Sequence, residues 1–295
     1  MHSTLAAAHA LIHLPPVMQH SEGSRHITIG IIDGPVDTGH PDLHTTLFKY
    51  VEGGGQVSCR STSSLACRHG TFVAGILGAG RDASAPGICP ACGFVARPIF
   101  CEAADFGQCP VVTTAHLAEA IYAVMRSGAR VINLSLGLAP AGIRKGQDAV
   151  LTEAFDEAFR KGVIIVGASG NHGRIGHNPL FDHPWVIPVV ACDEQGRPSA
   201  SSNIGLSIGQ RGIMAPGWPV THLGAGGGYT QLSGTSIAAP FVTGSIALLW
   251  SLCPQAAAQQ VHAAITQARS RKRGIVPPLL HVAGSKKTLE NMIRS

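Results

Sequence analysis

Short runs of apolar residues alternate along the chain with segments whose apolar positions recur at helical spacing. The runs over 27–32, 94–100, 130–136, 163–168 and 185–192 have the length and composition of buried strands. Helical spacing predicts helices over 70–77, 114–127, 150–159, 236–252 and 256–268, the first of them entered at His69. Alternating strands and helices predict an α/β fold, a doubly wound and mostly parallel sheet with helices on both faces.

Polar residues stand where three of these strands end. Asp33 closes the run over 27–32, Ser135 lies near the end of the run over 130–136, and Asn171 follows the run over 163–168. Functional groups of such sheets collect at the carboxyl ends of the strands. We therefore expect these three side chains to share one rim of the sheet.

Four residues in glycine-rich settings could together activate a hydroxyl nucleophile. Such a nucleophile needs a base, a carboxylate that orients the base, and donors aimed at the oxyanion. Ser236 begins a predicted helix within Leu-Ser-Gly-Thr-Ser-Ile-Ala-Ala-Pro, and His69 lies in Arg-His-Gly-Thr-Phe-Val-Ala-Gly. Asp33 ends a strand, and Asn171 stands in the turn Gly-Ala-Ser-Gly-Asn-His-Gly. Taken singly, these residues are commonly a helix cap, a structural histidine and turn residues.

The ordered Asp, His and Ser motifs resemble those of the subtilisin-like serine proteases, over nearly the whole chain from Ile27 to the last helix. The resemblance implies that Ser236 is the nucleophile, His69 the general base and then acid, and Asp33 the group that orients His69. It also implies that Asn171 and the backbone N–H of Ser236 stabilise the oxyanion.

A second carboxylate competes with Asp33. The triplet Asp37-Thr38-Gly39 matches a common family pattern, whereas Gly-Pro follows Asp33. We choose Asp33 because the strand over 27–32 leads directly into it and a rim carboxylate belongs at a strand end.

The resemblance also implies where a peptide substrate binds. An extended peptide would pair beside Ser135, Leu136 and Gly137, and Ala168, Ser169 and Gly170 would form one wall of the first specificity pocket. A second partner strand would lie near Gly107. We further expect His172, Arg174 and His177 to line the pocket and to favour acidic or polar substrate side chains.

The chain has eight cysteines and 15 histidines, which are the residue types of redox-active and metal-binding sites. Cys59/Cys67 and Cys101/Cys109 are each spaced for a local disulfide, and the sequence leaves reduced thiols and bridges equally open. Cys89-Pro-Ala-Cys92 precedes a strand instead of opening a helix, which favours a structural turn. No histidine spacing suits a compact metal site, and the loop over 78–87 has the single carboxylate Asp82. We expect no metal and no other cofactor.

Composition narrows the class of protein. Of 295 residues, 45% are hydrophobic and only 13% charged, which excludes a disordered chain or a coiled coil. No apolar run reaches the length of a membrane span. The net charge of +5 comes from a basic segment after Thr266, in which the cluster 269–273 more often forms a solvated surface than a nucleic-acid site. We expect residues 1–26 to be an N-terminal extension and 27–295 the catalytic domain.

Two segments, Ala85–Phe100 and Gln210–Pro216, look most like proteases of bacterial peptide natural-product clusters, including the cyanobactin type. This resemblance implies a serine endopeptidase that removes a leader or recognition sequence from a ribosomal precursor peptide. General degradation, peptide macrocyclisation and non-catalytic binding are the alternatives. The interval of 36 positions from Asp33 to His69 leaves no room for a subdomain that excludes water, which favours hydrolysis. We expect a cytoplasmic monomer without a folding propeptide, bound to neither membrane nor nucleic acid.

Overall fold

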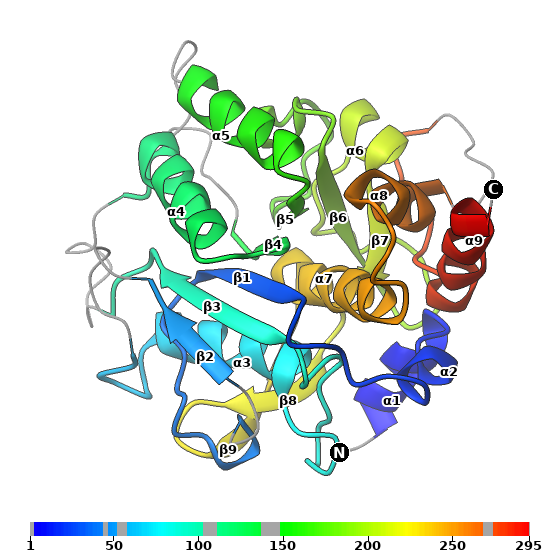
Figure 1. Ribbon diagram of the computed structural model, residues 1–295. Helices are drawn as coiled ribbons and strands as arrows, with labels where there is room; N and C mark the ends of the chain where they lie inside the picture. Colours follow the sequence, from blue (N-terminus) through cyan, green and yellow to red (C-terminus); the bar gives the residue numbers. More distant parts are fainter. Residues whose placement is uncertain are drawn as a thin grey trace.

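A seven-stranded parallel sheet forms the centre of the molecule (Figure 1). The computed structural model describes residues 3–43, 47–51, 58–102, 111–136, 148–267 and 274–294. The strands are β1 (Thr28–Asp33), β2 (Leu47–Tyr50), β3 (Gly93–Pro98), β4 (Val131–Leu134), β5 (Ile164–Ala168), β6 (Val186–Cys192) and β7 (Ile213–Pro216). Their order is β2-β3-β1-β4-β5-β6-β7, and every neighbouring pair runs parallel. The strand order therefore reverses at β1, which is where a doubly wound sheet binds its ligand.

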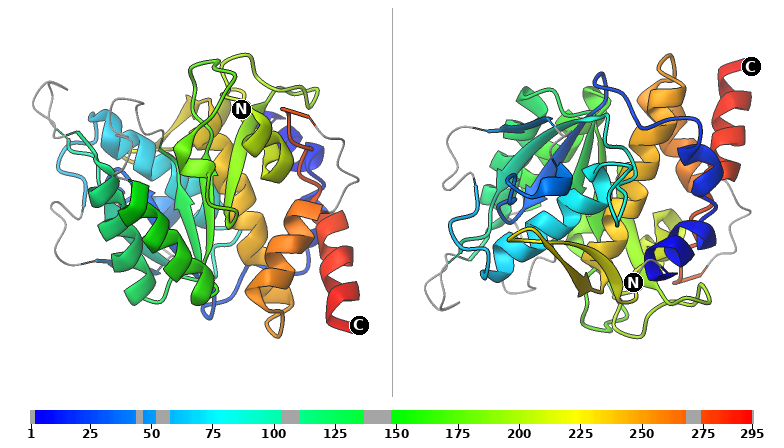
Figure 2. Two further views of the ribbon diagram at one scale, coloured as in Figure 1. Left: turned by 90° about the horizontal axis from the view of Figure 1, so that it is seen from above. Right: turned by 90° about the horizontal axis from the view of Figure 1, so that it is seen from below.

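Helices cover both faces of this sheet, as the alternating pattern predicts. Helices α4 (Thr114–Arg126) and α5 (Asp148–Arg160) pack on one face, and α3 (Leu65–Gly78) and α7 (Thr235–Leu252) pack on the other (Figure 2). Strands β5 and β6 are buried along their whole length, because each is covered from both sides. The predicted α/β fold is confirmed.

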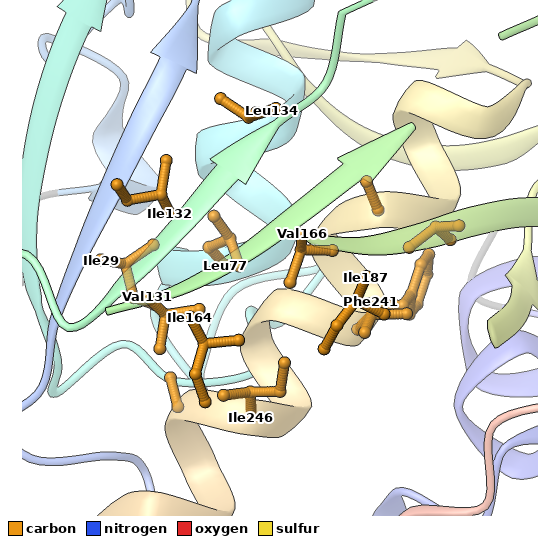
Figure 3. Packing of buried hydrophobic residues seen from close by; sticks show 14 of the residues in the cluster. Ile29, Leu77, Val131, Ile132, Leu134, Ile164, Val166, Ile187, Phe241 and Ile246 are labelled. Carbon is orange, nitrogen blue, oxygen red and sulfur yellow. The ribbon is translucent and has the colours of Figure 1, made fainter. Parts of the chain in front are cut away.

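The core consists mainly of small and aliphatic side chains, with a few buried aromatic residues such as Phe72 and Trp250. Isoleucine, valine and leucine residues of β1, β4, β5 and β6 meet Phe241 and Ile246 of α7 in a continuous apolar layer (Figure 3). Gly30 of β1 allows close packing of α4, because a Cβ there would lie 3.1 Å from Val124. Few aromatic residues are needed, since the layers approach closely.

Helix α7 is long and apolar enough to cross a membrane by length and composition. Within the fold, however, 83% of this helix is buried. Its neighbours are α3 and the strands β4, β5, β6 and β7. Its apolar surface is therefore accounted for by packing in the centre of the protein.

The predicted strands and helices are present with boundaries shifted by a few residues, and one shift affects the site. Helix α3 begins at Leu65 rather than at His69, because the Ser64 side chain caps it by accepting a hydrogen bond from the Cys67 N–H. His69 therefore lies in the second turn of the helix. Gly128 and Gly162 follow the ends of α4 and α5 and have positive φ values of 89° and 65°.

Several short elements escape the sequence pattern. They are β2, β7, the antiparallel pair β8 (Val220–Gly224) and β9 (Gly228–Leu232), α6 (Leu206–Arg211), and the terminal helices α1 (Ser3–Leu11), α2 (Pro15–Met18) and α9 (Val282–Arg294). Helix α8 (Ala258–Gln267), which is predicted, packs against α7 and α9.

Both ends of the chain pack onto the sheet layers. Helix α1 contacts β8, and α2 contacts α7 and α9. The Val282 N–H donates to the Ile12 carbonyl, and the Leu280 N–H donates to Met214 of β7. The basic cluster 269–273 lies outside the described residues. The described residues of the N-terminal segment, 3–26, thus pack onto the rest of the protein.

Candidate active site

The carboxyl ends of three neighbouring strands carry the polar groups that the sequence predicts there. Asp33 is the last residue of β1, Ser135 follows β4, and Asn171 stands three residues beyond β5. These strands are adjacent in the order β1-β4-β5. The expected shared rim is therefore present.

Asp33, His69 and Ser236 form a continuous hydrogen-bond relay. The distance from His69 Nδ1 to Asp33 Oδ1 is 2.7 Å, and that from His69 Nε2 to Ser236 Oγ is 3.0 Å. An ionised carboxylate only accepts hydrogen bonds, so Nδ1 must carry the proton of the neutral ring. Nε2 is then the acceptor toward which the Ser236 hydroxyl donates.

Two glycines bring the His69 helix close enough to β1 for this contact. A Cβ on Gly34 would lie 2.0 Å from the Ala66 carbonyl oxygen, and one on Gly70 would lie 2.5 Å from the Gly34 oxygen. Any side chain at either position would push α3 away from β1. The small residues of the His69 motif therefore set the distance between acid and base.

The environment of His69 favours its protonated form. Burial acts against the charged ring, but the negative charge of Asp33 and the hydrogen bond to it outweigh burial, so the pKa of His69 is raised above 6.5. The Asp33 side chain is fully buried, while that of His69 is 28% exposed. The Gly34 N–H donates to Asp33 Oδ1 at 2.6 Å and helps to hold the carboxylate.

Thr235 orients the Asn171 side chain. Its backbone N–H and its hydroxyl both donate to Asn171 Oδ1, each at 2.9 Å. The hydroxyl also accepts from the Gly170 N–H at 3.1 Å. Because the amide oxygen is occupied, the Asn171 NH₂ group is left as a donor. Gly234, with φ of 122°, allows this approach, since a Cβ there would lie 2.9 Å from Asn171 Nδ2.

Ser135 holds the main chain of Ser236. A proline inside a helix cannot donate to the carbonyl four residues earlier, and for Pro240 that carbonyl belongs to Ser236. The Ser135 hydroxyl supplies the missing bond at 2.8 Å. Asn133 donates to the Ser135 oxygen and in turn accepts from the Thr243 hydroxyl. A buried chain of hydrogen bonds thus links the ends of β4 to the start of α7.

A groove of about 590 Å³ runs past Ser236. Its described lining comprises Leu65, Ala66, Arg68, His69, Phe100, Cys101, Ser135, Leu136, Ala168, Gly170, Asn171, His172, Leu232, Thr235 and Ser236. Of the predicted substrate-binding residues, Ser135, Leu136, Ala168 and Gly170 are in this lining. Ser169 is fully buried instead, with its carbonyl bonded to the Asn203 amide. Gly107 and Gly137 lie outside the described residues.

His177 does not line the groove, contrary to the expectation from sequence. It lines a separate cavity of about 240 Å³ together with Arg174, and His172 borders both spaces. The reason is local: Asn203 Oδ1 accepts from the His172 and Arg174 N–H groups and turns the chain away from Ser236. His177 Nε2 contacts Asp182 Oδ1 at 2.7 Å.

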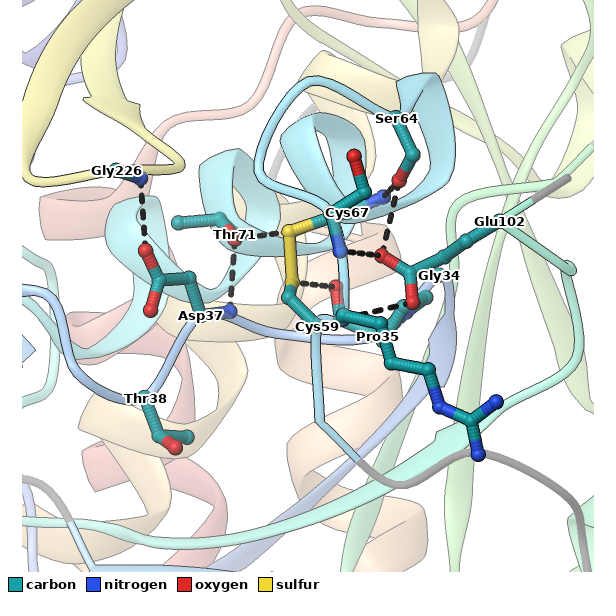
Figure 4. The surroundings of a disulfide bond; sticks show 12 residues. Gly34, Pro35, Asp37, Thr38, Cys59, Ser64, Cys67, Thr71, Glu102 and Gly226 are labelled. Atoms are coloured by element: carbon teal, nitrogen blue, oxygen red, sulfur yellow. Dashed lines mark hydrogen bonds between the residues drawn. A yellow bond between two sulfur atoms is a disulfide. The ribbon is translucent and has the colours of Figure 1, made fainter. Parts of the chain in front are cut away.

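Asp37, the competing carboxylate, is engaged elsewhere. Its Oδ2 accepts from the Gly226 N–H at 2.7 Å, and its own N–H donates to the Thr71 hydroxyl (Figure 4). Its Oδ1 accepts from the Gly39 N–H. Asp37 therefore fastens the loop after β1 to α3 and to the β8–β9 turn. The carboxylate that faces His69 is that of Asp33.

A disulfide joins Cys59 to Cys67 at the start of the His69 helix (Figure 4). Glu102 accepts from the Ser64 hydroxyl and from the N–H groups of residues 60 and 61, which holds the same loop. Of the two pairings considered, this one is present. Cys101 is also disulfide-bonded, whereas Cys109 lies outside the described residues.

Burial or contacts within the protein account for the other described cysteines and candidate metal ligands. Cys89 and Cys92 are buried free thiols in a turn, and burial raises the pKa of Cys89 well above its usual value. In the described part of the chain, the one cluster with metal-ligand spacing is Cys59, Cys67 and Glu102, and its two sulfurs are bonded to each other. His183 also has a partner within the protein, since its Nε2 lies 3.1 Å from Asp156 Oδ1.

Comparison with known proteins decides the family. The model of the subtilase family, peptidase S8, matches residues 24–286. Subtilisin DY of Bacillus licheniformis is 31% identical over 240 residues, which cover 80% of each chain. A thermophilic serine proteinase of Bacillus sp. strain AK1 is 33% identical over 231 residues, 78% of this chain and 54% of that protein. The chain belongs to the subtilase family. It is a subtilisin-like serine peptidase, a hydrolase.

Solved structures of cyanobactin maturation proteases resemble this subtilase strongly. A mutant of the PatA protease domain superposes with a TM-score of 0.81 at 32% identity, over 92% of this chain and 97% of that one. The prenylagaramide maturation protease PagA gives 0.78 at 28% identity, over 94% and 98%. The PatG macrocyclase domain gives 0.82, but at 21% identity it shows the shared fold alone.

Sequence reasoning assigned no role to three residues of the subtilase site. Thr235, Arg68 and Pro240 all lie inside the motifs that identify the family, directly beside Ser236 and His69 or one turn beyond. The contacts of Thr235 and Pro240 become visible only when α7, β4 and the Asn171 turn are brought together, and that of Arg68 only when α3 meets β9. Pro240 carried the available signal, since a proline within a helix always leaves one carbonyl to be bonded by another group.

Proposed function

We propose that this subtilase is an endopeptidase that acts through Asp33, His69 and Ser236 and an acyl-enzyme intermediate. The observation that carries the proposal is the relay of 2.7 and 3.0 Å from Asp33 through His69 to the Ser236 hydroxyl. Asn171 and the backbone N–H of Ser236 would be the oxyanion donors.

In this mechanism neutral His69 takes the proton of the Ser236 hydroxyl as its oxygen attacks the substrate carbonyl. The resulting imidazolium is stabilised by Asp33, whose charge already raises the pKa of the ring. The amide of Asn171 would donate to the developing oxyanion, and its hold by Thr235 would limit reorganisation during attack. His69 then protonates the leaving amine, and water releases the acyl group by the reverse sequence.

We further propose that the substrate is a ribosomal precursor peptide from which the enzyme removes a leader or recognition sequence. Similarity to the PatA and PagA proteases, at 32% and 28% identity over 92% and 94% of this chain, supports this choice. The fold-level likeness to PatG carries no argument for macrocyclisation. The proposal places the enzyme in the cytoplasm as a monomer.

Active-site labelling tests the catalytic residues. A fluorophosphonate probe should modify Ser236, and Ser236→Ala should abolish labelling. Asn171→Ala should still be labelled, but should lower kcat by about 10²- to 10³-fold. Absence of labelling in folded wild-type protein would contradict the mechanism.

Product analysis tests the substrate class. Precursor peptides encoded beside the gene should be cut at one site into linear products, while casein should be cut slowly. Ready digestion of casein with no preference for a precursor would favour the degradative alternative, and cyclic products would favour a transpeptidase. Cell fractionation would test the proposed cytoplasmic location, against which the Cys59–Cys67 disulfide counts, because disulfides persist mainly in oxidising compartments.

A further inference from the structure

The described lining of the substrate groove contains a single permanently charged side chain, that of Arg68. The other lining residues are apolar or neutral, apart from the two histidines His69 and His172. No aspartate or glutamate borders the groove among the described residues. A guanidinium in such surroundings is poorly screened and attracts an anionic group more strongly than an exposed one does.

The backbone of Arg68 is anchored, but its guanidinium makes few interactions with other described residues. It precedes His69 on α3, whose first turn is anchored by the Ser64 cap and the Cys59–Cys67 disulfide. Its Nη2 donates to the Thr230 hydroxyl of β9 at 3.5 Å, a long hydrogen bond. No carboxylate of a described residue forms an ion pair with it.

Arg68 is half-buried and belongs to the lining of the groove. Arg68 therefore combines a position beside the catalytic relay with a guanidinium that makes one long hydrogen bond and no ion pair with a described carboxylate. This is the arrangement expected of a residue that binds a carboxylate through two N–H groups.

We propose that Arg68 is a specificity-determining residue that binds a carboxylate of the peptide substrate, either an acidic side chain close to the cleaved bond or the terminal carboxylate. The inference rests on the proposed endopeptidase function and adds the charge of the substrate to it. It replaces the expectation that His177 confers acid preference, since His177 lies outside the groove.

The test is a set of quenched fluorescent peptides with Glu, Gln or Lys at each position from three residues before to three after the cut. Each peptide is made with a free and with an amidated C-terminus, so the two sources of a carboxylate are distinguished. The wild-type enzyme should cleave the best Glu peptide, or the free acid, about 10- to 100-fold faster in kcat/KM than its neutral counterpart.

Two variants locate the effect. Arg68→Gln should reduce the acid-to-neutral ratio to about one, and Arg68→Glu should invert it in favour of Lys. These ratios do not depend on how much folded enzyme each preparation contains. Arg126→Gln, which removes an exposed charge at the end of α4, should keep the wild-type ratio.

The outcomes separate the two proposals. A ratio near one in the wild-type enzyme, or an acid preference that survives in Arg68→Gln, would overturn the role of Arg68 and leave the endopeptidase intact. Failure of Ser236 to react with the fluorophosphonate and of every peptide to be cut would instead overturn the proposed function.

Discussion

At the scale of single residues, the hydrogen bonds of Thr235 fix the orientation of the Asn171 side chain in the candidate site. It is fully enclosed, with 1% of its surface exposed, and it makes three hydrogen bonds with the Asn171 turn. Two of the three need its hydroxyl. The residue touches no reacting atom, so it acts as a positioning residue for Asn171.

Thr235→Val removes the hydroxyl while keeping the shape of the side chain. We expect kcat to fall about fivefold to tenfold with little change in KM, because a neutral hydrogen bond contributes roughly 1 kcal/mol and Asn171 acts in the transition state. Thr235→Ser should restore most of the rate. Steady-state kinetics measures both, and an equal loss in the serine variant would contradict the role of the hydroxyl.

The pKa of His69 predicts the pH dependence of the enzyme. Only the neutral ring acts as a base, and Asp33 raises the pKa above 6.5 despite burial. Activity should therefore be low in acid and rise with pH through an apparent pKa above 6.5. A pH profile of kcat/KM, checked with the rate of fluorophosphonate labelling, measures it. An acid limb below 6.5 would show that burial outweighs the carboxylate.

At the scale of elements, two buried histidines connect the N-terminal helix to the hairpin before Ser236. His9 of α1 packs its ring edge on Phe241, and His222 lies in β8. Burial lowers the pKa of His9 to about 4, with a smaller contribution from Arg81. Burial also lowers the pKa of His222 to about 3, helped by the charges of His9 and His40 and opposed by a backbone hydrogen bond.

These histidines should make the fold sensitive to acid. The unfolded chain binds protons near pH 6.5 whereas the folded chain resists them, so stability falls as the pH drops below 6.5 toward the folded values. At pH 5 each histidine should cost about 2 kcal/mol of the free energy of unfolding. His9→Leu should remove about half of the loss between pH 7 and pH 5, measured by urea unfolding. His20→Gln, an exposed control, should leave it unchanged.

At the scale of the whole molecule, the N-terminal segment is part of the core. Its buried side chains include Leu5, Ala8, Ile12, Leu14 and Val17. They cover β8, α7 and α9, which otherwise would present apolar surface to water. Sequence reasoning treated residues 1–26 as an extension because the family motifs begin after them.

Removal of residues 1–20 should therefore destabilise the catalytic domain. Each large buried aliphatic side chain contributes about 1.5–3 kcal/mol, so the loss should lower Tm by about 10 °C or more. Calorimetry of the shortened chain measures this, with Gln19→Ala in the full chain as a control at an exposed position. An unchanged Tm would mean that the segment folds onto the domain without stabilising it.

The sequence alone determined the α/β class, the strands that carry Asp33 and Asn171, and the identity of the four candidate catalytic residues. The class and the strands could be predicted because buried strands are continuous apolar runs and because glycines and prolines mark turns locally. The four candidate residues came from the resemblance of their motifs to those of the subtilisin-like proteases. Short edge elements such as β2 and β8 give no such signal, since four or five residues of mixed polarity fit many structures.

Only the tertiary structure decided which neighbours complete the site. His177 lines a separate cavity, and Asp37 is bonded to the β8–β9 turn. Ser135 is bonded to the Ser236 carbonyl, and Arg68 is the one permanently charged side chain in the described lining of the groove. The hydrogen bonds that hold Asp37, Ser135 and the His172 turn join residues from about 30 to more than 180 positions apart in the sequence. Such distant contacts depend on how the helices pack on the sheet, and no local pattern of residues encodes that packing by itself.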